Sequence, residues 1–84
     1  METAEVGLYR DLRRAFDLIW AASDELAGDL DAHTRSPVEQ RLRALRVDFR
    51  SAEAAGDRAG MLRLAREMAT LGGDLAASRR GIAR

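Results

Sequence analysis

The chain has 84 residues, of which 46% are hydrophobic and 33% charged, and it contains one proline and no cysteine. This composition excludes disulfide bonds and a thiolate metal site, and it argues against intrinsic disorder. Fourteen arginines and no lysines balance fourteen acidic residues, so no net charge attracts the chain to nucleic acid or to an anionic membrane. We therefore expect a single helical domain over residues 1–84 that does not bind nucleic acid directly.

The longest run of apolar residues covers only residues 18–22, whereas a membrane-spanning helix needs roughly 20 residues. No secretory signal pattern is visible at the N-terminal end. The use of arginine in place of every lysine is typical of a GC-rich coding bias. These features predict a cytoplasmic bacterial protein without a membrane partner.

A long first helix is predicted over residues 4–32, with Thr3 as its N-cap. The stripe of apolar residues along it keeps its register across the pair Gly28-Asp29, so the helix is expected to continue through this pair. Apolar residues on both flanks widen the stripe, which allows the helix to contact two neighbours at once. The stripe follows alternating steps of three and four, the repeat of a left-handed coiled coil, and consists of Tyr9, Leu12, Phe16, Ile19, Ser23, Leu26, Leu30 and His33.

A helical hairpin is predicted to follow, with helices over residues 37–55 and 58–80. Ser36, Pro37 and Glu39 match a helix start, with serine as the N-cap, proline at the first helical position and glutamate closing a capping box. Gly56 suits the left-handed conformation that ends a helix and Asp57 can cap the next one, so the chain reverses there. The core stripes of the hairpin are Val38, Leu42, Leu45, Phe49 and Ala52, then Met61, Leu64, Met68, Leu71 and Leu75.

Together these elements predict an all-α antiparallel three-helix bundle with coiled-coil-like packing, in which a long first helix is followed by the hairpin. The third helix is expected to continue through the pair Gly72-Gly73, because Leu71 and Leu75 stay in register across it. Glycine costs roughly 1 kcal/mol in a helix interior, so the pair predicts a weak point with a kink or a close contact between helices. Residues 1–35 carry four arginines against eight acids, and residues 58–84 carry six arginines against two acids. The first and third helices, which would run parallel, therefore attract each other.

The predicted lengths of the first two helices do not match. A first helix of roughly 24 to 30 residues is about 36–45 Å long, whereas a second helix of roughly 18 residues reaches about 27 Å. Val6, Leu8 and Tyr9 would then project past the tip of the hairpin as exposed apolar surface, which usually marks a partner site. Leu18 and Val47 lie off the core stripes and complete the candidate interaction surface. We expect a homodimer, because a second copy is the simplest symmetric partner.

Arginines form the candidate anion-binding surface. Arg43, Arg46 and Arg50 lie within about 60° of one another on their helix, since each residue advances the helix by 100°. A solvated face in which Glu39 pairs with Arg43 explains the same pattern. The candidate clamps for an anionic molecule are Arg13, Arg14, Arg41, Arg43, Arg46 and Arg50.

Residues with the potential for catalysis or metal binding are scarce. His33 is the only histidine, and a metal site needs three or four converging ligands, so no metal is expected. The candidate serine nucleophiles, Ser23 and Ser78, fall on predicted core stripes, where small size accounts for them. No glycine-rich phosphate loop is present. The sequence thus predicts no catalytic, cofactor-binding or metal-binding residue, and it favours a protein that is not an enzyme while leaving an enzyme open.

Three families share features with the hairpin. The stretch 53–57, followed by a return helix rich in leucine and methionine, resembles the helical hairpin that ends bacterial primases and docks on the replicative helicase. The same stretch together with His33-Thr34 is similar to histidine-phosphotransfer domains. The order of helix lengths and the stretch 77–80 resemble the all-helical chorismate mutases, dimers that grip a dicarboxylate with arginines. Because these resemblances imply different activities, no family is assigned from them.

The main functional expectation is a small helical protein–protein interaction or regulatory module that acts as a homodimer and has a protein partner. The first alternative is a small all-helical enzyme or sensor that binds an anionic molecule through arginines, with an architecture like that of the chorismate mutases. The second alternative is an accessory factor of the replication or transcription machinery, which rests on analogy with the primase hairpin.

Overall fold

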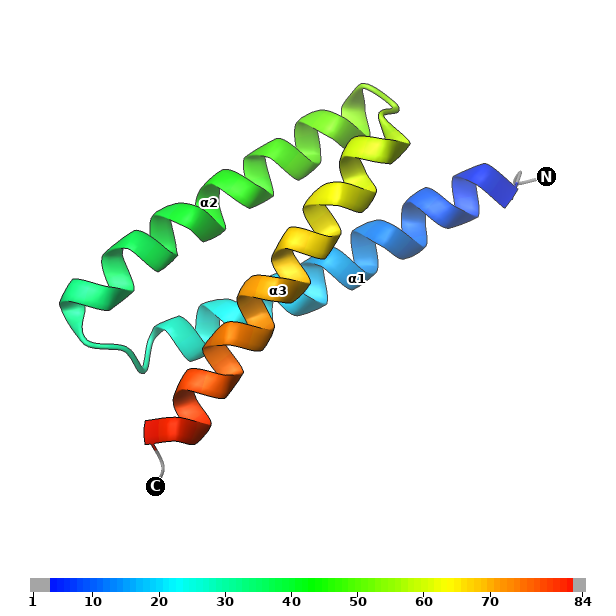
Figure 1. The fold of residues 1–84 in the computed structure, drawn as a ribbon. Helices are drawn as coiled ribbons and strands as arrows, with labels where there is room; N and C mark the ends of the chain where they lie inside the picture. The colour runs from blue at the N-terminus through cyan, green and yellow to red at the C-terminus, as the bar shows by residue number, and fades with distance from the viewer. Residues whose placement is uncertain (1–3, 83–84) are drawn as a thin grey trace.

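The structure, a computed structural model, describes the backbone of residues 4–82 and the side chains of residues 9–78. Within this range the chain forms three helices and no strand: α1 (Ala4–Ala27), α2 (Ala32–Ala54) and α3 (Arg58–Ile82). The chain reverses direction between α1 and α2 and again between α2 and α3, so α3 runs parallel to α1 and lies across it (Figure 1). The prediction of an all-α three-helix bundle is confirmed.

The core consists of one stripe from each helix, at the predicted steps of three and four. Phe16 of α1 and Phe49 of α2 form its centre, because their rings stack with centroids 4.2 Å apart and an angle of 13° between their planes. The closest packing partner of α1 is α3. The buried side chains of the core are those of Phe16, Ser23, Ala27, Leu42, Leu45, Phe49, Met61, Leu64, Met68 and Leu75.

The turn between α2 and α3 forms as predicted. Gly56 has a φ of +68°, the left-handed conformation that glycine adopts without a steric penalty. The amide of Asp57 donates a hydrogen bond to the carbonyl of Ala52 at 2.8 Å, which is the Schellman arrangement of a helix C-terminus. The carboxylate of Asp57 accepts a hydrogen bond from the amide of Gly60 at 3.0 Å and so caps α3.

The connection between α1 and α2 differs from the prediction. Helix α1 ends at Ala27 rather than near residue 32, and Gly28 begins a turn. The cap of α2 is Asp31, whose carboxylate accepts a hydrogen bond from the amide of Thr34 at 3.0 Å. Ser36 is therefore not the N-cap, and Pro37 lies inside α2. Proline at this position removes the hydrogen bond that its amide would donate to the His33 carbonyl, and α2 continues past it.

This earlier start makes the three helices nearly equal in length, at 24, 23 and 25 residues. At 1.5 Å per residue each is about 35–38 Å long. The prediction that the first helix is much longer than the second is therefore wrong. His33, expected to end the stripe of the first helix, lies instead in the first turn of α2, where it is exposed. At Gly72-Gly73, by contrast, α3 continues without a break.

Trp20 attaches α1 to α2 at the edge of the core. Its side chain is half-buried, and its Nε1 donates a hydrogen bond to the carbonyl of Leu42 at 2.9 Å. The guanidinium of Arg46 lies over the indole, 4.5 Å from the ring centroid, at a distance typical of a cation–π contact. The widened stripe of α1 thus does contact two neighbours, since Trp20 faces α2 and Ile19 faces α3.

The Asp31 cap makes the stability of α2 depend on pH. Hydrogen bonds from the Thr34 amide, and then from its hydroxyl, lower the pKa of Asp31 below its ordinary value of 3.8. The ionised carboxylate therefore adds stability that is fully present above this value and is lost as the pH falls through the lower folded-state pKa. We expect Asp31→Asn, which keeps an N-cap acceptor, to be less stable than the wild type near neutral pH and to lose this difference in acid.

The measurement for Asp31→Asn is the melting temperature of both chains between about pH 6 and pH 2, a range that extends well below the ordinary aspartate pKa of 3.8. Asp31→Ala is the matched control, because it removes the acceptor and should melt below Asp31→Asn at every pH. A gap between wild type and Asp31→Asn that stays constant on acidification would contradict the assignment of Asp31 as the cap.

Candidate interaction surface

Helices α1 and α3 approach each other closely at Gly72. A Cβ atom at this position would lie 2.9 Å from Ser23 Oγ and 3.3 Å from Ile19 Cγ2. Ser23 is 1% exposed, and its hydroxyl donates a hydrogen bond to the Ile19 carbonyl at 2.7 Å. The absence of a side chain at Gly72 therefore sets the separation of the two helices, which confirms the predicted close contact.

Next to this contact, a shallow apolar groove runs between α1 and α3 on the outer side of the bundle. It encloses about 400 Å³, and none of its nine lining residues is charged. Leu18 stands at its edge with 67% of its surface exposed, the highest value among the large apolar residues of the described region. We call this feature the α1–α3 groove; its lining is Leu18, Ile19, Ala22, Ser23, Leu26, Ala69, Gly72, Gly73 and Ala76.

Two further hollows of opposite charge adjoin the α1–α3 groove along α1. The basic hollow, of about 370 Å³, is lined by Arg10, Arg13, Arg14, Asp17 and Leu18. The acidic hollow, of about 500 Å³, is lined by Ala22, Glu25, Leu26 and Asp29. Leu18 belongs to both the groove and the basic hollow, while Ala22 and Leu26 belong to both the groove and the acidic hollow. One continuous face of α1 is thus basic at one end, apolar in the middle and acidic at the other end.

The five predicted interaction residues do not form a single surface. Leu18 lies in the continuous face of α1, whereas Val47, which is 64% exposed, belongs to α2 and lines neither the groove nor the hollows beside it. Tyr9 does not project past the hairpin, because its ring packs against the core and its hydroxyl donates a hydrogen bond to the Gly56 carbonyl at 3.4 Å. Val6 and Leu8 lie outside the described side chains.

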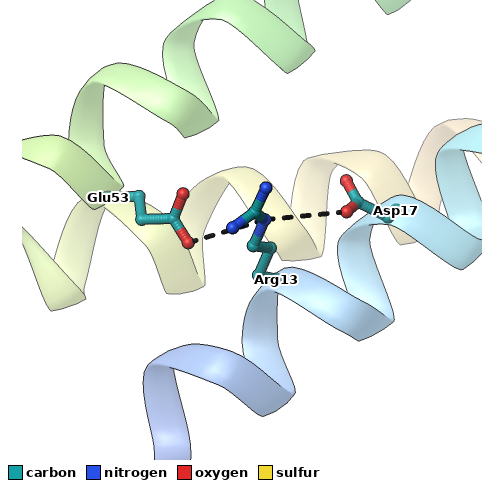
Figure 2. A network of polar contacts seen from close by, with 3 residues as sticks. All are labelled: Arg13, Asp17 and Glu53. Atoms are coloured by element: carbon teal, nitrogen blue, oxygen red, sulfur yellow. Dashed lines mark ion pairs between the residues drawn. The ribbon is translucent and has the colours of Figure 1, made fainter. Parts of the chain in front are cut away.

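Two of the six predicted arginine clamps form ion pairs with other residues of the chain. Arg13 lies between two carboxylates, with its Nε 3.9 Å from Asp17 and 3.9 Å from Glu53 of α2 (Figure 2). Arg41 of α2 donates a hydrogen bond to Glu67 of α3 at 2.7 Å. These pairs are largely exposed, so each adds at most about 1 kcal/mol to stability, and they occupy the guanidinium groups that an anion would need.

The remaining arginines do not converge on a common site. Arg46 stacks on Trp20, while Arg14, Arg43 and Arg50 are exposed and form no ion pair with the described residues. Arg14 lines the basic hollow on α1. Arg41 lines a different hollow of about 640 Å³ along α3, which also contains the acidic residues Glu67 and Asp74. The predicted clamp is thus spread over two helices and several faces.

The residues considered for catalysis or metal binding do not come together in a site. Ser23 is buried at the contact between α1 and α3, as predicted, whereas Ser78 is exposed and does not belong to the core. Among the described side chains within residues 4–82, no group of three or more histidine, aspartate or glutamate residues lies close enough together to hold a metal ion. Within the same range, none of the helices combines the length and the apolarity that crossing a membrane requires.

Sequence reasoning missed the contribution of α3 to the candidate surface. Ala69, Gly73 and Ala76 line the α1–α3 groove, although each lies outside the core stripe of α3. The available signal was their spacing of four and three, which places small residues along one helix flank next to the predicted close contact at Gly72.

No protein-family model, curated protein or solved structure matches this chain. The function of the surface must therefore be inferred from its own geometry.

Proposed function

We propose that this chain is a small helical protein–protein interaction module that acts as a homodimer through the outer face of α1. The observation that carries the proposal is the exposure of Leu18 at the edge of an uncharged groove. A single exposed leucine is common, but this one adjoins eight other apolar or small residues from two helices. Contiguous apolar surface of this kind is typical of interaction sites.

The folded core does not need Leu18. The core stripe of α1 passes through Phe16, Ser23 and Ala27, and Leu18 lies on the opposite side of the helix, since two residues advance it by 200° from Phe16. A polar residue at position 18 would keep the chain folded and lower the exposed apolar area. A leucine at position 18 is therefore better explained by a contact with another molecule than by the packing of the bundle.

The first test is the molar mass in solution. We expect sedimentation equilibrium to give twice the chain mass of 9.3 kDa at high concentration and a reversible shift toward one chain mass on dilution. Leu18→Gln removes one apolar side chain from each copy, each contributing about 1.5 kcal/mol or more to association, so the dissociation constant should rise about a hundredfold.

Val47→Gln is the matched control for Leu18→Gln. The two residues have nearly equal exposure, 64% for Val47 and 67% for Leu18, but Val47 lies outside the α1–α3 groove. We expect Val47→Gln to dimerise like the wild type. A single chain mass for the wild type at every concentration would refute the proposed homodimer, and dissociation caused by Val47→Gln alone would move the interface to α2.

A further inference from the structure

We infer that the two copies associate with their α1 helices antiparallel across a two-fold axis, with Arg14 of each copy opposite Glu25 of the other. This inference rests on the proposed homodimer and adds its orientation, its register and its electrostatic contacts. It assigns the occupant of the α1–α3 groove, which is the α1 helix of a second copy. The argument depends on how charge is distributed along the face that contains Leu18.

The charges on α1 are separated along its length. Residues 10–17 contain three arginines and two aspartates, whereas residues 24–29, at the end of α1 and in the turn that follows, contain three acids and no base. Arg14 lines the basic hollow and Glu25 the acidic hollow, on either side of the apolar stretch around Leu18 and Ala22. Neither Arg14 nor Glu25 forms an ion pair with another described residue. Their charges are therefore open to a neighbouring molecule.

Only one orientation of two such helices pairs opposite charges. In a parallel dimer each basic hollow would meet a basic hollow and each acidic hollow an acidic one, which is unfavourable. In an antiparallel dimer the basic hollow of each copy meets the acidic hollow of the other, so the two-fold axis forms this contact twice. The face of α1 is thus complementary to itself, which favours a second copy over a partner helix of unrelated sequence.

The apolar contacts fit the same register. The pair Arg14 and Glu25 and the pair Leu18 and Ala22 are both centred on the turn that contains Ile19 and Trp20, so a two-fold axis there brings both pairs together. Leu18 of one copy then lies against Ala22 of the other. Small residues at the contact let helices approach closely, and a Cβ at Gly73 in the groove would meet nothing within 4 Å, so there is room for the partner's side chain.

Charge reversal tests the orientation directly. Arg14→Glu and Glu25→Arg each create two like-charge contacts in the antiparallel homodimer. We expect each single variant to raise the dissociation constant about tenfold to a hundredfold at low salt, since exposed pairs are worth up to about 1 kcal/mol each. The double variant Arg14→Glu/Glu25→Arg should dimerise like the wild type, because the opposite charges are exchanged but still paired. An equimolar mixture of the two single variants should form a heterodimer of wild-type affinity.

The measurement is sedimentation equilibrium of the full chain at low and at high salt, with thermal melting of each variant at a concentration that gives monomers as the check on folding. Screening by salt should shrink the differences between variants. A wild-type dimer that neither single variant weakens would overturn this inference while leaving the proposed homodimer intact. A double variant no better than the single variants would also overturn it, because exchanging both charges restores two opposite-charge contacts in the antiparallel dimer. A monomeric wild type would refute both the inference and the proposed function.

Discussion

Phe16→Ala is expected to lower the free energy of unfolding by about 3–5 kcal/mol, the range found for removing a buried aromatic ring. Phe16 is 1% exposed and its ring stacks on that of Phe49, which is equally buried. The substitution removes the central contact between α1 and α2 and leaves a cavity in the core. The loss therefore includes the transfer free energy of the ring and the cost of the cavity.

This loss is large compared with the total stability of so short a chain. At about 0.05–0.15 kcal/mol per residue, a chain of this length has a free energy of unfolding of about 4–13 kcal/mol. Urea unfolding followed by helical circular dichroism measures the difference, in the Leu18→Gln background so that association does not add to stability. Phe16→Leu keeps an apolar side chain and should cost clearly less. A loss below about 1 kcal/mol for Phe16→Ala would show that the two rings do not form the centre of the core.

The hairpin and the core could be predicted because their signals are local and unambiguous. Gly56 followed by Asp57 combines a residue suited to positive φ with a capping carboxylate, and the apolar steps on either side stop and restart at this pair. The stripe through Leu42, Leu45 and Phe49 fixes which side of α2 is buried whatever its exact ends are. Patterns of this kind depend on the helical repeat alone, so they transfer directly from sequence to structure.

The start of α2 could not be predicted because two capping signals overlap. Asp31 with Thr34 and Ser36 with Glu39 have the same spacing, and the second carries the additional signal of Pro37. Which of the two caps forms depends on which backbone amides at the start of α2 lack a partner, and the sequence does not show this. In the structure the Asp31 cap forms, and Glu39 pairs with Arg35 at 3.7 Å rather than with Arg43.

The wrong start of α2 also led to a wrong prediction for the candidate interaction surface. Starting the helix at Ser36 shortened α2 and left the N-terminal part of α1 without cover, which made Tyr9 a surface residue. The exposure of Leu18 was predicted correctly, because its position opposite the core stripe follows from the helical repeat. The partners of Arg13 and Arg41 on other helices could not be found, since Glu53 and Glu67 come close only when the helices pack.

Gly72→Leu is expected to lower the free energy of unfolding by about 2–3 kcal/mol, near the upper end of the cost of overpacking a well-packed contact. Ser23 cannot make room easily, because it is buried and its hydroxyl is bound to the Ile19 carbonyl. The new side chain would therefore push α3 away from α1. Replacing a helical glycine gains back up to about 1 kcal/mol, which is why the net loss is smaller than the steric cost.

Gly73→Leu is the matched control, because it changes the adjacent residue in the same helix to the same side chain. A Cβ at Gly73 meets nothing within 4 Å, so the chain should keep its stability or gain up to about 1 kcal/mol. Urea unfolding of both variants in the Leu18→Gln background measures the difference, and equal stabilities would contradict the close contact at Gly72. In the chain with Leu18 intact, the leucine at position 73 would occupy the α1–α3 groove, so this stable variant should also weaken the proposed dimer. Substitutions at the two neighbouring glycines thus distinguish the contact between α1 and α3 inside the bundle, at Gly72, from the surface proposed to bind a second copy, at Gly73.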